Sequence, residues 1–574
     1  MSAVASRPGA RPRVRRANSG TAWRPSRPGW PGVLLLLGLA VQLAPVLLLP
    51  MVLTQDGPAH LDGAWVLRHH GDDGPVGAAL RSNYWVDLRP VPNLLTTLLL
   101  AGLLRVLGPD TAEKVVVAGF MVLLVAGLRF ALRGVDRRAG WLAVAALPLA
   151  GAELVAFGFY NFCWGVALGL FVVGMALRCR DGWTIRHTVT AALLLVLTWS
   201  AHLLPWMVTV LLVGALAVGR WVVTVRAGAG AGVGRAVKVH LLPPVLAVLP
   251  TVALSAGYVL GGGGQHGAVA GAPSIARVGW LLTLYRPLVV SSWWELVPAV
   301  AVTLVLGRLA VAARRPGPVG EGTAPADGPL AGSDRLVLGA SAVAAAAAVL
   351  LSPARLGPEY GFLPERLAWF PPLLLVLFCA TRMPSRSSAR RAVAVVLVLA
   401  ATTAALVRLP TQLADQRTAA EFLSVAGDLP PGAVFAVLRF SGHEASLAPL
   451  KGAPDPLRHL SSRLAVAAGA VDVGHYEAIY PYFQARFLPG SVRETIDPGL
   501  NGLERIPPSL HLDAAGNRLQ YVLVVGLDRA EGWVRSAHRT AGVLADLRAG
   551  YVQVATSGPS GYVSVWRLRD GTDG

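Results

Sequence analysis

Successive apolar runs, most of them about as long as the roughly 20 residues that carry a helix across a bilayer, constrain this chain more than any other feature. Of its 574 residues, 54% are hydrophobic and only 14% are charged, so the chain is far more apolar than a soluble protein. We therefore expect an α-helical polytopic membrane protein with about eleven spans. The predicted spans are residues 33–53, 114–132, 141–157, 160–177, 188–201, 203–219, 237–259, 296–313, 335–352, 367–381 and 390–408.

The basic residues predict how these spans are oriented. The net charge is +19, yet Lys and Arg gather in residues 1–31 and in short loops between the apolar runs. Such loops stay on the cytoplasmic side, so residues 1–31 are expected to form a basic cytoplasmic arm. The charge therefore indicates membrane orientation and not nucleic-acid binding. The basic loops are residues 129–138, 178–187, 220–238, 308–335 and 382–391.

Residues 92–107 decide the topology, because they are apolar but short for a crossing. Pro90 and Pro92 break the approach to them, so we predict a helix lying along the membrane surface. The spans then define a transmembrane domain over residues 32–408, with a long external first loop at residues 54–112. An odd number of spans also places the chain after the last span outside the cytoplasm.

Residues 409–574 have a different character. Strand-like runs alternate with helical stretches, which predicts a small external α/β domain. The aromatic segment from Tyr476 to Phe483 suits core packing, or docking on the membrane part, better than sugar stacking. The strand-like runs are Val434 to Phe440, Tyr521 to Val525, Tyr551 to Ala555 and Tyr562 to Leu568.

Asp56 is the leading candidate for a catalytic carboxylate. It opens the stretch Asp56-Gly57-Pro58-Ala59-His60, which directly follows the first span. An ionisable pair at that place is costly near lipid, which indicates a site that faces water. The alternative is that Asp56 caps a helix beginning near Pro58. The stretch alone favours a helix-capping role for Asp56, whereas the polar residues around it favour a catalytic role.

Further polar residues gather on the external side of the predicted topology. Carboxylates, histidines and arginines facing one aqueous surface suit transfer from an anionic lipid, with a carboxylate as base and Arg on the phosphate. Asp56, His60 and His202 are also ordinary metal ligands, so a divalent metal stays open, although no recognised spacing supports one. The predicted substrate-binding residues are His60, Glu153, Tyr160, Asn161, His202, Arg286, Glu365 and Arg366.

This pattern resembles the GT-C superfamily of membrane glycosyltransferases over nearly the whole chain. The stretch Gln55 to His60 resembles the family's first-loop acidic motif, with the catalytic Asp falling on Asp56. The stretch Gly158 to Phe162 occupies the place of the second acidic motif. It carries Asn161 where many members have an acidic residue, which argues against metal binding unless Glu153 substitutes. Arg366 matches the family's phosphate-contacting Arg before a late span.

The resemblance implies an inverting transfer of a sugar from a polyprenyl-phosphate lipid to an extracytoplasmic glycan or protein acceptor. Asp56 would deprotonate the acceptor hydroxyl, and Arg366 or Arg286 would stabilise the departing phosphate. Two other functions stay open. A non-catalytic protein of envelope assembly is favoured by Asn161. A transporter of lipid-linked substrates would need ionisable residues inside the spans, which the sequence largely lacks.

Overall fold

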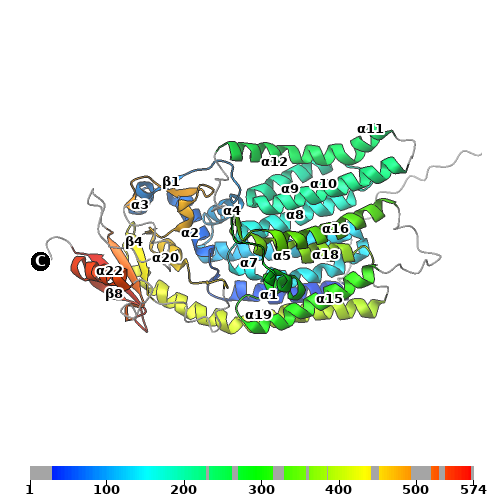
Figure 1. Ribbon diagram of the computed structural model, residues 1–574. Coiled ribbons are helices and arrows are strands. Elements are labelled where there is room, and N and C mark those ends of the chain that lie inside the picture. Colours follow the sequence, from blue (N-terminus) through cyan, green and yellow to red (C-terminus); the bar gives the residue numbers. More distant parts are fainter. Residues whose placement is uncertain are drawn as a thin grey trace, which may run out of the picture.

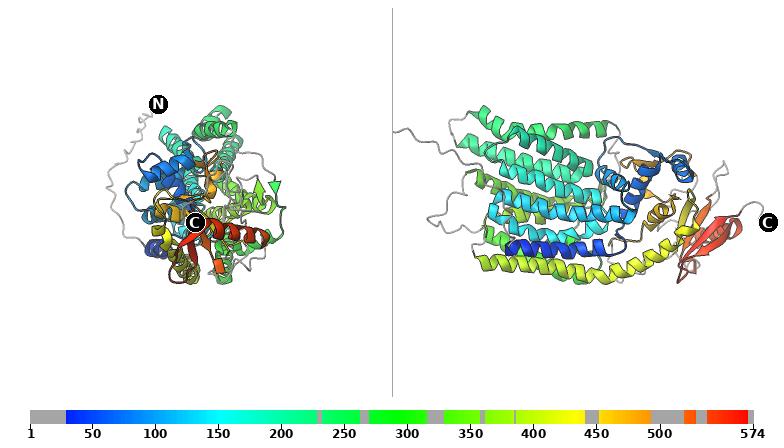
Figure 2. Two further views of the ribbon diagram at one scale, coloured as in Figure 1. Left: turned by 90° about the vertical axis from the view of Figure 1, so that its left-hand side faces the viewer. Right: turned by 180° about the vertical axis from the view of Figure 1, so that it is seen from behind.

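The structure is a computed structural model that describes residues 29–227, 232–261, 269–314, 329–356, 361–383, 386–440, 452–492, 519–528 and 537–569. Long helices lie side by side in a bundle, and a smaller body of helices and strands covers one end of it (Figure 1). Two further views show the same arrangement, with the C-terminal sheet farthest from the bundle (Figure 2). We call this smaller body the cap.

Eight helices in the described ranges are long and apolar enough to cross a membrane, which confirms a polytopic helical membrane protein. Their lipid-facing sides expose Leu and Val, as expected where the solvent is hydrocarbon. These helices are α1 (Trp30–Leu48), α5 (Pro109–Val135), α8 (Tyr160–Arg178), α10 (Leu203–Arg226), α12 (Leu242–Leu260, continuous with α11, Val233–Ala236), α15 (Leu296–Arg314), α16 (Pro329–Leu351) and α19 (Ser387–Leu423).

Three predicted spans take shorter or irregular forms, so the predicted number of eleven is not confirmed. Residues 141–157 do not form one helix, because Pro148 cannot donate a backbone hydrogen bond and Gly151 follows it. Their side chains are nonetheless almost wholly buried inside the bundle. The elements in question are α9 (Ile185–Ala201), α18 (Phe370–Cys379) and, for residues 141–157, the 3₁₀ helix η1 (Arg137–Ala146) with α6 (Leu147–Ala150) and α7 (Glu153–Ala156).

The short helix predicted within residues 92–107 is present as α4 (Leu95–Leu103). Nine residues of α-helix extend only about 14 Å, less than half of the roughly 30 Å hydrocarbon core. α4 packs against α2 (Gly57–His69), which belongs to the cap. The chain therefore enters and leaves this region on the same side of the bundle.

The cap contains a five-stranded sheet in the order β5-β4-β7-β9-β8. β4 is parallel to β5 and β7, whereas β9 is antiparallel to β7 and β8. The four predicted strand-like runs correspond to β4, β7, β8 and β9, so the small α/β unit is confirmed. Its elements are β4 (Val434–Arg439), α20 (Leu460–Ala468), β5 (Val471–Asp472), the 3₁₀ turn η5 (Tyr476–Ile479), β7 (Tyr521–Val525), α22 (Ala537–Gly550), β8 (Tyr551–Thr556) and β9 (Val563–Leu568).

The first loop and the C-terminal chain fold together as one body. β1 (Tyr84–Val86) pairs antiparallel with β6 (Ala485–Phe487), and α2 packs on α20. Tyr84 at the end of α3 (Pro75–Asn83) shares a hydrophobic core with β4 and β7. The functional residues of the two segments are therefore brought together although more than half of the chain lies between them.

α19 joins the bundle to the cap without a break. It spans 37 residues, about 55 Å, and continues past Pro410 into the cap (Figure 1). The predicted boundary between residues 32–408 and 409–574 thus falls inside one helix, and this division of domains stays a prediction.

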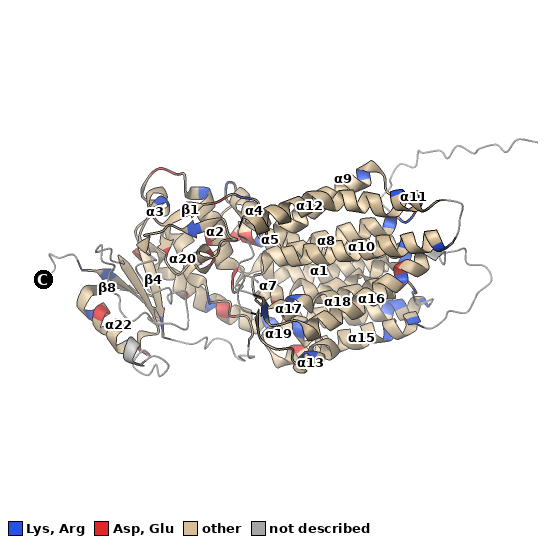
Figure 3. Ribbon diagram, turned by 45° about the horizontal axis from the view of Figure 1, so that its top comes forward, with Lys and Arg blue, Asp and Glu red and all other residues tan. Residues whose placement is uncertain are grey.

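Lys and Arg gather at the end of the bundle away from the cap (Figure 3). The loop between α5 and η1 and the loop between α8 and α9 both lie at that end (Figure 1). That the arginine-rich end is cytoplasmic and the cap external stays a prediction from the positive-inside rule.

Candidate functional site

The start of α2 places Asp56 at the junction of the bundle and the cap. Pro58 suits the first helical turn because it needs no hydrogen-bond donor there, and a side chain at Gly57 would collide with Thr54 and Tyr160. The Asp56 backbone N–H donates to the Phe157 carbonyl at 3.0 Å. Its side chain makes no capping hydrogen bond, so the geometry does not support the helix-cap alternative.

Asp56 faces a cavity of about 250 Å³ between the bundle and the cap. Both parts contribute to its wall, and most of the polar side chains come from loops and helix ends. Of the predicted site residues, Asp56, His60, Asn161, His202 and Arg366 line it. The rest of the wall consists of Asn93, Phe159, Phe162, Arg355, Gly361, Phe362, Tyr476, Tyr480, Tyr482 and Phe483.

The surroundings of Asp56 raise the pKa of its carboxyl group toward neutral pH. Burial raises its pKa from 3.8 to about 6, and this effect outweighs the charge of His60, which lowers the pKa. Gln55 Nε2 donates to Oδ1 at 3.2 Å, and the Tyr476 hydroxyl is a further hydrogen-bond partner. A carboxyl group with a pKa of about 6 is ionised at pH 7 and still accepts a proton readily, as a general base requires.

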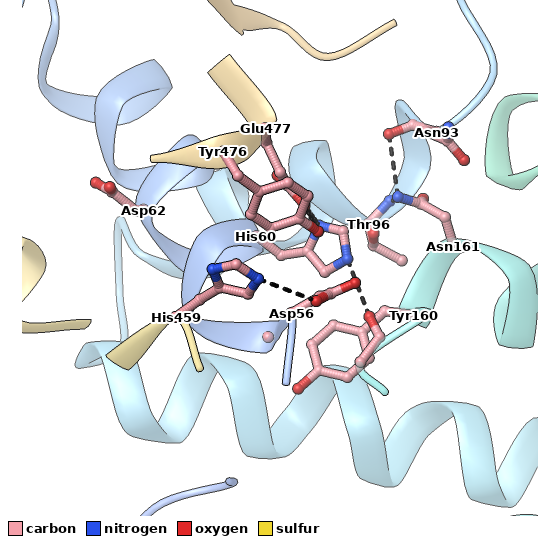
Figure 4. A network of polar contacts seen from close by, with 12 residues as sticks. Asp56, His60, Asp62, Asn93, Thr96, Tyr160, Asn161, His459, Tyr476 and Glu477 are labelled. Carbon is pink, nitrogen blue, oxygen red and sulfur yellow. Dashed lines mark hydrogen bonds and ion pairs between the residues drawn. The ribbon is translucent and has the colours of Figure 1, made fainter. Parts of the chain in front are cut away.

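His60 lies one turn further along α2, beside Glu477 (Figure 4). Its Nε2 is 3.0 Å from the Gly158 carbonyl oxygen, and its Nδ1 is 2.6 Å from Glu477 Oε1. Burial alone would lower the pKa of this imidazole, but the Glu477 carboxylate reverses the effect, and the pKa is raised.

Two further histidines are held neutral by their surroundings. Burial keeps the pKa of His459 well below its usual value, and its Nε2 is 3.6 Å from Asp56 Oδ1, longer than a normal hydrogen bond. Its ring stacks on Tyr476. Burial, together with the charge of Arg366, also lowers the pKa of His202. His202 Nδ1 accepts the Leu204 N–H at 3.1 Å, so the proton of the neutral ring belongs on Nε2.

Arg366 presents a cation to the cavity. It lies on α17 (Leu363–Leu367), and its guanidinium sits 4.5 Å from the centre of the Phe159 ring. Within the described part of the chain, no hydrogen bond or ion pair engages this guanidinium. Burial lowers its pKa, but a guanidinium remains charged. Arg355 of β3 (Arg355–Leu356) lines the same cavity.

Four predicted site residues do not line the cavity: Glu153, Tyr160, Arg286 and Glu365. Glu153 is fully buried and forms an ion pair with Arg286, whose Nη2 also donates to the Gly452 carbonyl at 3.2 Å. Glu365 precedes Arg366 on α17 but lies outside the cavity wall. The charges of Glu153 and Arg286 thus compensate each other, and substrate contact by these four residues stays a prediction.

Tyr160 and Asn161 form bonds that hold the fold together around the cavity. The Tyr160 hydroxyl donates to Glu113 at 2.7 Å and lies 2.8 Å from Thr54 Oγ1. Asn161 accepts the Thr96 N–H at 3.0 Å and donates to the Asn93 carbonyl at 3.1 Å. An amide is required for that pair of bonds, because a carboxylate cannot donate.

The sequence did not identify the contribution of the cap to the site. Tyr476, Tyr480 and Tyr482 line the cavity, and Glu477 contacts His60 from the same segment. The dense aromatic run was the available signal, but its composition suits a core equally well. Figure 4 shows Tyr476, Glu477 and His459 approaching Asp56 and His60, whereas Asp62 points away from them.

The residues proposed as metal ligands do not fit that role. Both ring nitrogens of His60 already face other groups, and His202 Nδ1 accepts a backbone hydrogen bond. In the ranges that the structure describes, no group of three or more His, Cys, Asp or Glu side chains is arranged to hold a metal ion. Asp56 and His202 alone are fewer ligands than a protein site for a divalent metal normally supplies.

Comparisons with known proteins give structural similarity only. No family model matches the chain, and no curated protein matches it. The crystal structure of ArnT from Cupriavidus metallidurans bound to undecaprenyl phosphate is similar, with a TM-score of 0.49 and 12% identity over 94% of this chain and 98% of that chain. The apo structure of the same protein gives a TM-score of 0.46 and 13% identity, over 94% and 97%. At this identity, the chemistry of the site is read from the residues of this chain.

Proposed function

We propose that this chain is an integral membrane glycosyltransferase that moves a sugar from a polyprenyl-phosphate donor to an acceptor hydroxyl outside the cytoplasm. One observation carries the proposal. A buried carboxylate with a pKa of about 6 and an arginine without an ion-pair partner in the described chain face the same cavity, at the end of a membrane bundle. Base and phosphate-binding cation are the two groups that such a transfer requires.

In the proposed reaction, Asp56 takes the proton of the acceptor hydroxyl as its oxygen attacks the anomeric carbon of the donor sugar. The bond from that carbon to the phosphate oxygen breaks, and the electron pair leaves with the polyprenyl phosphate. Arg366 stabilises the charge that develops on the phosphate. Attack on the face opposite to the leaving phosphate inverts the anomeric configuration.

The shape of the cavity supports a sugar as the transferred group. A volume of about 250 Å³ accommodates one monosaccharide, and a wall with Tyr476, Tyr480 and Tyr482 offers both ring faces and hydroxyl groups. His202 lines the same cavity with a neutral ring whose Nε2–H can donate to a hydroxyl. These groups recognise a polar ligand that carries apolar ring faces.

An apolar groove in the bundle supports a lipid carrier. It has a volume of about 850 Å³ and runs between α13 (Ala276–Thr283), α15, α16 and α18. Its wall includes Pro371, five residues after Arg366, and reaches Arg314 at the end of α15. A polyprenyl chain in this groove would place its phosphate near α17.

The test is transfer by the purified protein in lipid vesicles. Polyprenyl-phosphate monosaccharides with labelled sugars are supplied together with cell-envelope glycans or proteins as acceptors. We expect labelled acceptor and free polyprenyl phosphate in equal amounts, both lost in Asp56→Asn. Movement of the intact lipid-linked sugar across the vesicle membrane would instead show a transporter. Absence of both, with donor bound, would leave a non-catalytic protein of envelope assembly.

A further inference from the structure

We infer that Glu477, supplied by the cap, is a positioning residue that holds His60 as an imidazolium beside Asp56. The inference rests on the proposed function for its catalytic consequence, but the charge state of His60 can be measured independently. Glu477 lies on η5, so the C-terminal chain completes the environment of a base that belongs to the first loop.

The contact between these two side chains is close and dry. His60 Nδ1 and Glu477 Oε1 are 2.6 Å apart, and the side chains are 7% and 3% exposed. The Tyr476 hydroxyl donates to the same Glu477 oxygen at 3.4 Å. Glu477 is therefore fixed against His60 and not directed into solvent.

The neighbours of His60 determine how many protons it carries. Nε2 faces the Gly158 carbonyl, which only accepts hydrogen bonds, so this nitrogen must donate. Nδ1 faces a carboxylate, which also accepts. With a carboxylate on one side and a carbonyl on the other, the ring is favoured with a proton on each nitrogen. The competing arrangement, a neutral His60 with a protonated Glu477, gives up an ion pair inside a low-dielectric site.

The charged and titratable groups around His60 make this imidazolium useful. Asp56 belongs to the same helix start, Glu477 comes from η5, Tyr160 from α8, and His459 precedes α20. His459 is neutral, so of the two histidines beside Asp56 it is His60 whose charge offsets the buried carboxylate. Without Glu477, burial would strip the proton from His60, and Asp56 would lose that support.

The first measurement is the charge state of His60, which needs no substrate. Full-length protein with ¹⁵N-labelled histidine is reconstituted in bilayers, and the His60 signals are assigned by their absence in His60→Asn. We expect both ring nitrogens of His60 to be protonated at neutral pH. In Glu477→Gln, the proton affinity of His60 should fall about ten- to a thousandfold, which leaves a neutral ring.

Asp87→Asn is the matched control, because Asp87 also joins the first loop to the C-terminal chain, through Arg486 at 2.8 Å. It should leave the His60 signals unchanged. A neutral His60 in the wild-type protein would overturn the inference, and so would an imidazolium that persists in Glu477→Gln.

The second measurement tests the consequence for Asp56. Glu477→Gln should lower kcat and move the acid limb of the rate profile to higher pH, because the loss of the His60 cation outweighs the smaller, opposite effect of losing the Glu477 charge. Glu477→Asp keeps the charge and should restore part of the rate. An unchanged acid limb with a neutral His60 would limit Glu477 to a structural role. If wild-type protein transfers no sugar at all, the proposed function fails while the His60 measurement still stands.

Discussion

Two polar networks lie at the junction of the bundle and the cap, and they differ in whether their charges are paired. In the first, Arg463 of α20 pairs with Glu113 and Asp110 of α5 and donates to the Val52 carbonyl at 3.1 Å. Tyr160 extends this network through its bond to Glu113. Each charge there faces an opposite charge inside the protein, and none of these residues lines the cavity.

In the second network, Asp56 and Arg366 line the cavity and do not pair with each other. Burial makes the ionised form of Asp56 unfavourable, although the group is still ionised at pH 7. The guanidinium of Arg366 contacts only the ring of Phe159. Buried charge of this kind lowers stability and is retained where a ligand completes it. The Arg463 network therefore stabilises the contact between the bundle and the cap, whereas Asp56 and Arg366 form the candidate site at the same junction.

The largest expected effect is that of Asp56→Asn on sugar transfer. Removal of a general base should lower the rate by about two to four orders of magnitude. Its effect on folding has the opposite sign. The folded-state pKa of about 6 lies above 3.8, so ionisation opposes folding as the pH rises through this interval, by about 3 kcal/mol once complete. At neutral pH, Asp56→Asn should therefore unfold no more easily than the wild type in a thermal melt, and transfer at the wild-type rate would discard the mechanism.

Arg463→Met should reverse this pattern and destabilise the protein. It leaves Glu113, which is fully buried, without its cation, and breaking one side of a buried pair costs about 3–5 kcal/mol. The double variant Arg463→Met with Glu113→Gln removes the orphaned charge and should recover part of the loss. Denaturant unfolding in detergent measures both. Equal stability of the single variant and wild type would show that this network does not stabilise the fold.

Arg366→Gln should weaken binding of the lipid donor with little change in stability, because the guanidinium has no internal partner to lose. Loss of a charged hydrogen bond to phosphate costs about 1.5–3 kcal/mol, or roughly 10- to 150-fold in affinity. Binding of a polyprenyl phosphate to the protein in detergent measures this directly. Arg308→Gln, an exposed arginine on α15, is the control, and similar losses in both variants would remove Arg366 from the site.

The sequence predicted those features that depend on local pattern. Apolar runs of sufficient length identified the membrane-spanning helices, and strand-like runs between helical stretches identified four strands of the cap sheet. The 3₁₀ helix at Arg137–Ala146 was not predicted. Contact with lipid would require a regular α-helix, but this segment is buried inside the bundle, where irregular backbone is tolerated.

The site divides in the same way. Asp56 and Arg366 were recognisable because each is a charge beside an apolar segment. The pairing of Glu153 with Arg286, and of His60 with Glu477, joins distant parts of the chain, and no single sequence states which charges meet. Composition likewise could not tell the tyrosines of the cavity wall from those of a core.

Asn161→Asp tests the one departure from the expected acidic pattern. The new carboxylate could accept the Thr96 N–H, but it would face the Asn93 carbonyl with no proton to donate. An unmade bond of this kind should cost about 1–3 kcal/mol of unfolding free energy, with transfer reduced only as far as the folded fraction falls. A gain of metal-dependent activity in Asn161→Asp would instead mean that this position belongs to a metal site.

The smallest expected effect is the pH dependence of the wild-type rate. Only ionised Asp56 can take the acceptor proton, so kcat/KM should rise with pH and reach half of its plateau at about 6. Between about pH 8 and about pH 6 the rate should therefore change only about twofold, and below that about tenfold for each further pH unit. Arg463→Met should leave this pH profile unchanged, because Arg463 does not line the cavity. Arg366→Gln should lower the rate but keep the same rise with pH, since the charge of Arg366 acts on the phosphate. A profile that is flat from about pH 5 to about pH 8 would show that no group like Asp56 limits the reaction, and would assign the base to another residue.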